Sequence, residues 1–244
     1  MTEKIHKVLA RAGLGSRRRV EQWIEQGRVT INGEVARIGA RVDSGDKLAV
    51  DGRPVEPAAP KTPRILVYHK PLGELVTRDD PQGRPTVFRS LPDPGPGRWI
   101  AVGRLDINST GLLLFTDDGE LANRLMHPRA NLDREYLVRV YGAVDGETIE
   151  RLKAGIELDG RPARFKSVVP VGRKPGPNQS FRVVLSEGRN REVRRLWEAV
   201  GCSVSRLKRI RYGPVKLPRD LEPGQWRYMP AAQVRRLTGA KSGA

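Results

Sequence analysis

A proline-rich segment divides this chain of 244 residues into two unequal parts. Residues 54–63 read PVEPAAPKTP, with a proline at every third position. Proline has no backbone N–H to give to a sheet and cannot continue a helix, so we expect a semi-stiff linker over 56–63. The linker separates a small domain over 1–55 from a larger domain over 64–238. The last residues, 239–244, read GAKSGA, which is typical of a disordered tail.

The small domain carries the signals of two short helices and a β-hairpin. Apolar residues recur at helical spacing between Ile5 and Ala12. Ser16 can cap a second helix, and Gly27 can end it. The pair Asn32-Gly33 stands between alternating apolar residues, which indicates a tight turn between two strands.

The larger domain mixes strand and helix signals, which predicts an α+β fold around a largely antiparallel mixed sheet. A hairpin is expected over 157–171, with its turn at Asp159-Gly160. Further strands are expected over 65–68, 100–102, 111–116, 136–141 and 181–185. Helices are expected after Gly119, over 145–154 and over 189–200.

The charge of the chain favours a polyanionic partner. Lysine and arginine number 45 against 28 aspartates and glutamates, so the net charge is +17 at pH 7. Such an excess of positive charge is typical of proteins that bind nucleic acid. A basic surface without a binding function is the alternative.

The sequence also speaks against several classes of protein. The longest apolar run, 112–115, is far shorter than the roughly 18 residues that cross a bilayer, and no apolar signal segment follows the first residues. Cys202 is the only cysteine, and His6, His69 and His127 lie far apart. No glycine-rich phosphate loop occurs. We therefore expect a cytoplasmic monomer without metal, nucleotide cofactor or membrane partner.

One polar loop stands out as a candidate site. Residues 103–111 read GRLDINSTG and lie between two predicted strands. Functional residues favour loops that rigid elements hold in place, so Arg104 and Asp106 are candidates. Two alternatives remain at this point: Asp106 hydrogen-bonds its own loop amides, or Arg104 and Asp106 form a weak exposed ion pair.

Four motifs in the larger domain resemble, in order, those of the pseudouridine synthases that modify ribosomal RNA. They are 68–73 (YHKPLG), 103–106 (GRLD) with 110–114 (TGLLL), 134–138 (REYLV) and 187–196 (EGRNREVRRL). The small domain resembles the RNA-binding domain first described in the fourth protein of the small ribosomal subunit. Together the two resemblances cover nearly the whole chain apart from the linker and the tail.

The resemblance implies the chemistry. Conversion of uridine to pseudouridine rearranges the substrate alone, so no cofactor is required. The family assigns the essential carboxylate to Asp106, which could attack C1′ or remove a ribose proton. Arg194 resembles the cation that keeps this carboxylate ionised. Without the motif, Arg194 would be a solvated charge beside the apolar stripe of the predicted helix.

The resemblance also names residues around the flipped base. Arg104 resembles the arginine that fills the gap left in the RNA stack. Tyr136 and Leu196 resemble the residues that line the uracil pocket, although plain core packing would explain both positions as well.

Basic residues complete the expected RNA contacts, although each could equally be a solvated charge. Arg191-Glu192 stand where the family's small-subunit enzyme typically has His-Gln, so the last motif is similar to that of the large-subunit branch. The resemblance therefore implies 23S ribosomal RNA as the partner. A 16S ribosomal RNA target and a non-catalytic RNA-binding assembly factor are the alternatives. The basic residues expected to contact RNA are Arg17, Arg18, Arg19, Arg28, Lys70, Arg189, Arg191 and Arg195.

Overall fold

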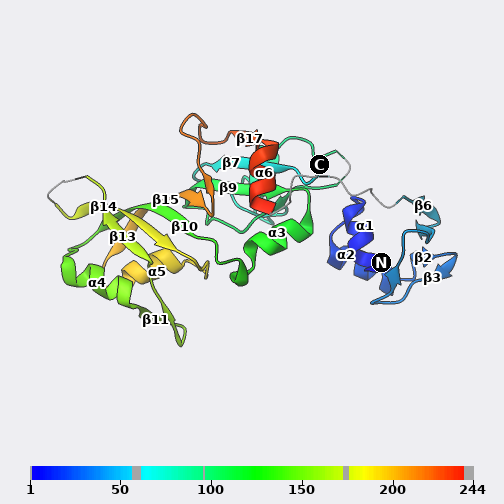
Figure 1. The fold of residues 1–244 in the computed structure, drawn as a ribbon, viewed down its shortest axis with the longest axis horizontal. Helices are drawn as coiled ribbons and strands as arrows, with labels where there is room; N and C mark the ends of the chain where they lie inside the picture. Colours follow the sequence, from blue (N-terminus) through cyan, green and yellow to red (C-terminus); the bar gives the residue numbers. More distant parts are fainter. Residues whose placement is uncertain (1, 57–61, 96, 173–175, 239–244) are drawn as a thin grey trace. The chain divides into compact units, whose positions relative to one another are not determined.

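The computed structural model describes residues 2–56, 62–95, 97–172 and 176–238, and the chain forms two compact units (Figure 1). Residues 57–61 of the expected linker and the expected tail at 239–244 lie outside the described residues. The first unit comprises Met1–Pro63, Pro92–Ile100 and Asp117–Gly119. The second comprises Arg64–Leu91, Ala101–Thr116 and Glu120–Ala244.

The first unit contains two helices, a four-stranded sheet and a two-stranded sheet. The predicted cap at Ser16 is present, because its Oγ accepts a hydrogen bond from the Arg19 N–H at 3.1 Å. Apolar residues of both helices, including Ile5, Leu9 and Val20, form one core with the sheet. The elements are α1 (Ile5–Arg11), α2 (Arg17–Glu25), β1 (Glu3–Lys4) paired with β4 (Arg41–Val42), and the order β3 (Glu34–Val35), β2 (Val29–Ile31), β5 (Leu48–Val50), β6 (Arg53–Val55).

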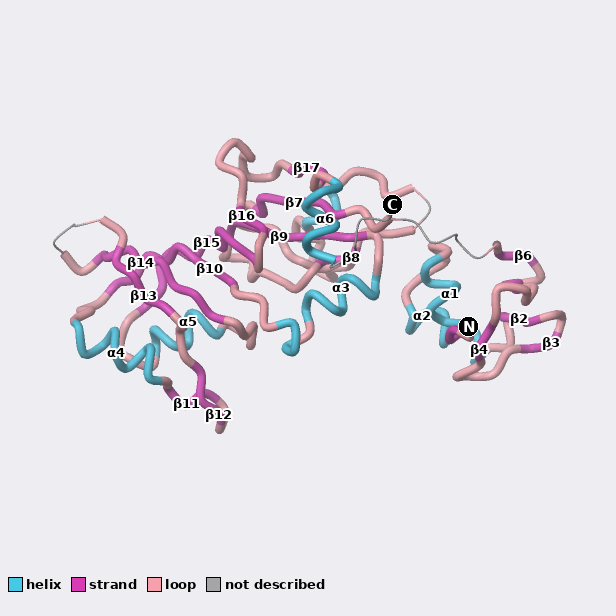
Figure 2. The backbone as a smooth tube through the Cα atoms, viewed as in Figure 1, coloured by secondary structure: helices cyan, strands magenta, loops and turns pink. Residues whose placement is uncertain are grey.

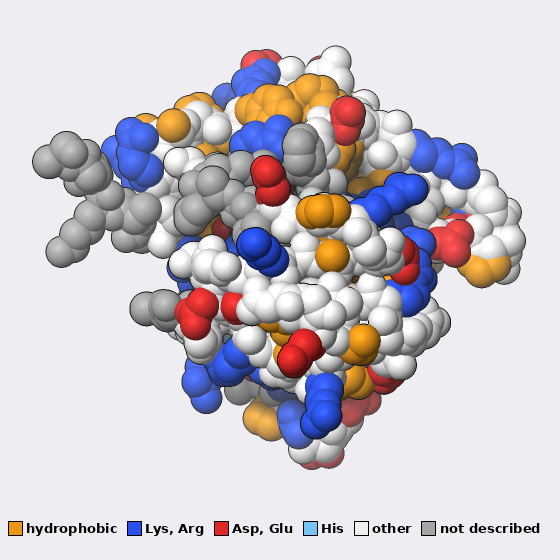
Figure 3. Space-filling model, turned by 90° about the vertical axis from the view of Figure 1, so that its right-hand side faces the viewer, with side chains coloured by type: hydrophobic (Ala, Val, Ile, Leu, Met, Phe, Trp, Pro, Cys, Tyr) orange, Lys and Arg blue, Asp and Glu red, His pale blue; other side chains and the backbone are white. Residues whose placement is uncertain are grey.

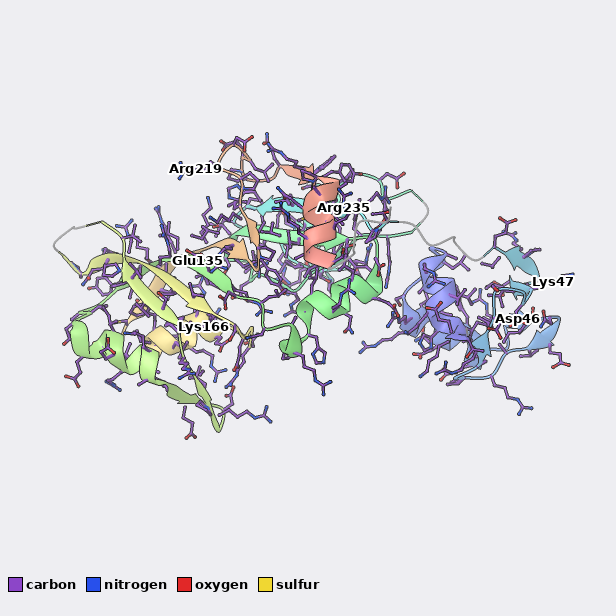
Figure 4. All side chains as sticks on the ribbon, in the orientation of Figure 1. Asp46, Lys47, Glu135, Lys166, Arg219 and Arg235 are labelled. Carbon is purple, nitrogen blue, oxygen red and sulfur yellow. The ribbon has the colours of Figure 1, made fainter. Side chains whose placement is uncertain are left out.

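The predicted hairpin turn at Asn32-Gly33 is present. Both residues have a positive φ, 53° and 90°, which asparagine and glycine tolerate best. The Asn32 side chain donates to the Asp46 carboxylate at 2.8 Å and accepts from the Lys47 N–H at 2.9 Å. Figure 4 labels Asp46 and Lys47 beside this hairpin. The turn is therefore held by a second loop of the same unit.

The second unit is built on one mixed sheet (Figure 2). Neighbouring strands along its main path are antiparallel except β15 and β9, which are parallel. The expected α+β fold with a largely antiparallel sheet is confirmed. The main path runs β13 (Ser167–Pro170), β14 (Asn178–Leu185), β10 (Arg134–Tyr141), β15 (Ser203–Tyr212), β9 (Thr110–Thr116), β7 (Ile65–Lys70) and β17 (Trp226–Tyr228), with β8 (Ile100–Ala101) and β16 (Val215–Lys216) off it.

Two helices cover one face of the sheet at its β13–β14 end (Figure 1). Trp197 of α5 packs on Phe181 of β14, with ring centroids 5.0 Å apart. Along β10 the side chains alternate between buried and exposed from Tyr136 to Tyr141, so the opposite face is open. The helices of this unit are α3 (Gly119–Met126), α4 (Gly146–Ala154), α5 (Glu192–Glu198) and α6 (Ala231–Thr238), with the short hairpin β11 (Ile156–Leu158) and β12 (Arg161–Ala163).

Strand β15 is the main element that the sequence analysis missed. Its ten residues alternate poorly, because Arg209 occupies a buried position and two register shifts interrupt its pairing with β10. Strands β16 and β17 and helix α6 were not predicted either. Helix α5 spans Glu192–Glu198 and is shorter than the predicted helix over 189–200. Among the described residues, no helix is long and apolar enough to cross a membrane.

Candidate active site

A pocket of about 400 Å³ in the second unit gathers five of the predicted site residues. Arg104 and Asp106 reach it from the loop before β9, and Tyr136 reaches it from β10. Arg189 and Arg191, predicted to contact RNA, line it from the segment before α5. Three of the four sequence motifs, which lie far apart along the chain, therefore converge on one cavity.

The loop that carries Asp106 is anchored at several points. Leu105 is buried, and the backbone N–H of Ser109 donates to the backbone carbonyl of Asp106 at 3.0 Å. This amide thus bonds to the backbone of Asp106 and not to its carboxylate. The described residues include no ion pair between Arg104 and Asp106. The Asp106 side chain is partly exposed on the pocket wall, and that of Arg104 is exposed.

Arg194 supports this loop through a hydrogen bond from inside the protein. It is only 5% exposed, so it is not a solvated charge. Its guanidinium donates to the Asn108 carbonyl at 3.0 Å and to the Val204 carbonyl at 2.8 Å. Burial lowers the pKa of Arg194, the charge of Arg191 lowers it further, and the Asp106 carboxylate acts in the opposite direction. Arg194 is therefore a buried cation that interacts with Asp106 through space while it holds the neighbouring loop residue.

Lys70 requires a correction. We expected it to contact RNA, but its side chain is fully buried. The ammonium donates to the carbonyls of Pro71 at 2.9 Å and Ser109 at 2.8 Å. Burial lowers the pKa of Lys70 from 10.5 to about 8, although the carboxylates of Glu74 and Asp106 act in the opposite direction. Lys70 therefore supports the loop from inside the protein, as Arg194 does, and its side chain is not exposed for a contact with RNA.

The lowered pKa of Lys70 predicts a pH-dependent stability. Between pH 8 and 10.5 the unfolded chain keeps this proton and the folded chain loses it, so the contribution of Lys70 to the free energy of unfolding rises with pH. We expect Lys70→Met, which does not titrate, to lose stability relative to wild type as the pH increases from 7.5 to 10. Urea unfolding of both proteins at the two pH values measures this. A constant difference would contradict the assignment.

Tyr136 lies where the predicted pocket aromatic should be, whereas Leu196 does not. Tyr136 is 7% exposed and lines the pocket with an apolar wall that includes Leu185 and Leu207. Leu196 is fully buried on α5 and is absent from the pocket wall, so its expected pocket role is corrected to core packing. Glu192 and Val193, in the first turn of α5, are the residues of this helix that line the pocket.

Three pocket residues were missed by the sequence analysis. The guanidinium groups of Arg134 and Arg209 lie 5.0 and 5.2 Å from the centre of the Tyr212 ring. The Tyr212 hydroxyl donates to the Leu125 carbonyl at 2.9 Å. Arg209 and Tyr212 belong to β15, so both could have been predicted as pocket residues only if that strand had been recognised in the sequence. Arg134 is the first residue of the REYLV motif at 134–138. Its positive charge two residues before Tyr136 could have marked it as a pocket residue.

The basic residues of the first unit differ in whether their charge is already paired with a carboxylate of the protein. Arg17, Arg18 and Arg19 begin α2, and the last two are exposed. The guanidinium of Arg19 lies 5.4 Å from the centre of the Trp23 ring. Arg28 makes two hydrogen bonds to Asp51, at 2.8 and 2.6 Å, so its charge is already paired.

The basic residues around α5 are mostly engaged within the protein. Arg195 makes two hydrogen bonds of 2.7 Å to Asp159. Arg189 donates to the carbonyls of Leu158, Arg161 and Pro162, and therefore holds the β11–β12 hairpin. Arg191 is exposed at the pocket edge, 4.0 Å from Glu198. Blue Lys and Arg side chains also occur among acidic ones on the face drawn in Figure 3.

The site's donor set is that of an organic binding pocket and not of a metal centre. Two carboxyl groups (Asp106 and Glu192), two aromatic rings (Tyr136 and Tyr212) and several guanidinium groups surround the cavity. Within the described ranges, no group of three or more His, Cys, Asp or Glu side chains could hold a metal ion. Such a pocket can bind a planar base and place one carboxylate against it.

Comparison with protein families matches both parts of the chain. Residues 64–199 match the RNA pseudouridylate synthase model, and residues 3–48 match the S4 domain. The chain is also similar to a solved structure described as a pseudouridylate synthase, with a TM-score of 0.66 and 26% identity over 96% of this chain and 99% of that one.

Curated relatives extend the likeness over almost the whole chain. Ribosomal large subunit pseudouridine synthase B of Pseudomonas aeruginosa is 57% identical over 95% of this chain, which spans 61% of that relative's length. The proteins of the same name from Salmonella typhimurium and Escherichia coli K12 are 54% identical over 98% and 97% of this chain, and the matches cover 83% and 82% of their lengths. Because the family model covers more than half of the chain and the curated relatives are 54–57% identical, this chain belongs to the RNA pseudouridylate synthase family.

Proposed function

We propose that this protein converts a specific uridine of large-subunit ribosomal RNA to pseudouridine, with Asp106 as the essential carboxylate. The observation that carries the proposal is the pocket that joins Asp106 to Tyr136 and Arg104. The large-subunit target rests on relatives that are 54–57% identical and are named ribosomal large subunit pseudouridine synthase B. The resemblance of the Arg191-Glu192 motif to the same branch supports it.

The reaction needs little more than this pocket supplies. The bond from C1′ of the ribose to N1 of uracil breaks, the base turns and a new bond joins C1′ to C5. The hydrogen on C5 then leaves as a proton, and N1 takes up a proton. Asp106 acts on the ribose, either by attack at C1′ or by removal of a ribose proton. The buried side chains of Lys70 and Arg194 hold the loop that carries Asp106, through hydrogen bonds to the carbonyls of Ser109 and Asn108.

The target uridine has to leave the RNA stack before it can react. Extrusion of a base costs a few kcal/mol, and stacking on an aromatic side chain recovers roughly 1–3 kcal/mol. Tyr136 offers such a surface inside the pocket. Arg104 is exposed next to Asp106, where its planar guanidinium suits the vacated place in the stack.

The remaining assignments follow from the domain organisation. We assign RNA binding to residues 1–55 and catalysis to residues 64–238. Arg17, Arg18 and Arg19 at the start of α2 suit phosphate contacts, and Arg191 suits a contact at the pocket edge. We also propose that the protein acts as a monomer.

Pseudouridine mapping tests the proposed target. Purified protein is incubated with unmodified 23S and 16S transcripts, and pseudouridines are mapped by carbodiimide labelling and reverse transcription. We expect one modified site, in 23S RNA alone. Modification of 16S RNA alone would move the chain to the small-subunit branch. Tight binding of RNA without modification of either transcript would favour an assembly factor.

A further inference from the structure

Arg209 is a buried arginine with spare hydrogen-bonding capacity at the wall of the pocket. It is 2% exposed, and its Nη2 has no hydrogen-bond partner among the described residues. A buried polar atom without a partner is costly, so such atoms are rare outside functional sites. Neither the family motifs quoted above nor the expected RNA contacts include this residue.

The protein fixes the position of this side chain. Its Nε donates to the Leu112 carbonyl of β9 at 2.7 Å. The guanidinium also lies 5.2 Å from the centre of the Tyr212 ring. One edge of the group is therefore anchored to the sheet, the unpartnered nitrogen is buried, and Arg209 is one of the residues that line the pocket.

The register of the sheet places Arg209 beside the aromatic residue that receives the base. Tyr136 of β10 and Arg209 of β15 are direct partners across the antiparallel pair. Direct partners share one face of a sheet, with Cβ atoms about 4.5–5.5 Å apart. Both side chains line the same pocket. A base stacked on Tyr136 would therefore have its edge within reach of the Arg209 guanidinium.

We propose that Arg209 recognises the flipped uracil by donating a hydrogen bond from Nη2 to a carbonyl oxygen of the base. This inference rests on the proposed function and assigns a substrate contact within it. Arginine only donates hydrogen bonds, and uracil offers two acceptors, O2 and O4. Cytosine carries an amino group in place of O4, so a donor facing that edge would also discriminate against cytosine.

The same hydrogen bond would assist the reaction. When the C1′–N1 bond breaks, its electron pair moves to N1 and spreads onto O2 and O4. A fixed donor at either oxygen is then stronger in the transition state than in the ground state. Formation of the C1′–C5 bond uses this electron pair and leaves the base neutral; the C5 proton is then lost and N1 takes up a proton, so the product is neutral as well. Arg209 gains and loses no proton in this sequence.

A cycle that changes both protein and RNA tests the contact. RNA substrates carry uridine, 2-thiouridine or 4-thiouridine at the mapped site, each labelled with tritium at C5. Sulfur is a poor hydrogen-bond acceptor, so replacement of the contacted oxygen should slow single-turnover release by wild type about tenfold more than it slows release by Arg209→Lys. The cycle cancels the intrinsic effect of sulfur on the chemistry.

Arg211 provides the matched control on the same strand. Its Nε donates to Glu135 at 2.6 Å, and it is absent from the wall of the active-site pocket. Figure 4 labels Glu135 on β10. We expect Arg211→Lys to respond to both thio-substituted RNAs as wild type does.

The outcomes separate this inference from the proposed function. Coupling of Arg209, but not of Arg211, to one of the two oxygens supports the contact. Additive effects at both oxygens, with a folded and active Arg209→Lys, would overturn it and leave the function intact. An Arg209→Lys that fails to fold calls for Arg209→Gln in the same cycle, because glutamine keeps an amide donor. No tritium release by wild type from the uridine substrate would instead overturn the function.

Discussion

Asp106→Asn is expected to abolish turnover while the fold and the affinity for RNA remain. Asparagine has nearly the same shape, but it can neither attack C1′ nor accept a proton at neutral pH. Loss of such a group lowers the rate by at least about 10⁴-fold. The loop should survive, because the Ser109 amide bonds to the backbone of residue 106 and Arg194 bonds to the Asn108 carbonyl.

Three measurements on this variant separate catalysis from binding. Circular dichroism should match wild type, and the dissociation constant for the RNA substrate should be unchanged or slightly lower, since one negative charge near phosphates is removed. The single-turnover rate should fall below detection. A variant that retains more than one per cent of the wild-type rate would show that Asp106 is not the essential carboxylate.

Gly111→Ala is expected to unfold the second unit or to destabilise it severely. A Cβ at this position would lie 2.2 Å from the Arg209 carbonyl oxygen and 2.7 Å from its amide nitrogen. Residue 111 also has a φ of +103°, which an alanine rarely adopts. Both partners are backbone atoms of adjacent strands, so no side chain can move to relieve the overlap. We expect a loss of more than about 4 kcal/mol in the free energy of unfolding.

Gly146→Ala is the matched control for this prediction. Gly146 begins α4, and a Cβ there would meet nothing within 4 Å. We expect a change within about 0.5 kcal/mol, or a slight gain from the reduced freedom of the unfolded chain. Urea unfolding compares the two variants. Equal stability of both would mean that β9 and β15 do not approach as closely as described.

The close approach at Gly111 also explains how the parallel pair of strands supports the site. Lys208 and Arg209 pair with Thr110 and Gly111, just after the loop that carries Asp106. The glycine allows the backbone of β15 to lie against this loop's end, and Arg209 reaches the Leu112 carbonyl from there. Within the GRLD…TGLLL motif, Gly111 is therefore needed for the packing of two strands, and Asp106 is the residue proposed for the chemistry.

Motif order allowed much of the site to be predicted from the sequence. The loop at 103–111, the pocket position of Tyr136 and the basic segment before α5 follow from motifs whose residue types match one reaction. The small domain was equally readable, because its signals are local: a cap at Ser16 and a turn at Asn32-Gly33 depend on neighbours within a few residues. Features that depend only on residues close in sequence can be predicted from the sequence alone.

Strand β15 shows what remained hidden. Its inward positions include Arg209, and a buried arginine breaks the alternation that marks a strand. The bonds of this arginine to Leu112 and Tyr212 form only in the folded sheet. Lys70 was misjudged for the same reason, since its burial depends on carbonyls supplied by two loops.

Charge pairing over long sequence separations limited the prediction of RNA contacts. Arg28 pairs with Asp51 and Arg195 with Asp159, at separations of 23 and 36 residues. No periodicity in the sequence marks such pairs. An arginine with two short bonds to a carboxylate must give them up to bind a phosphate. Arg18 is exposed, and Arg191 is only weakly paired, at 4.0 Å from Glu198, so these two are better candidates for phosphate contacts.

Release of tritium from C5 of uridine tests the central claim most directly. Pseudouridine cannot form without loss of that hydrogen, because C5 carries the bond to C1′ in the product. Large-subunit ribosomal RNA labelled at C5 is incubated with excess wild-type protein, and tritium released to water is counted against RNA. We predict one equivalent per RNA molecule with wild type and none with Asp106→Asn. Absence of release by wild type from free RNA and from immature large subunits alike would contradict the account.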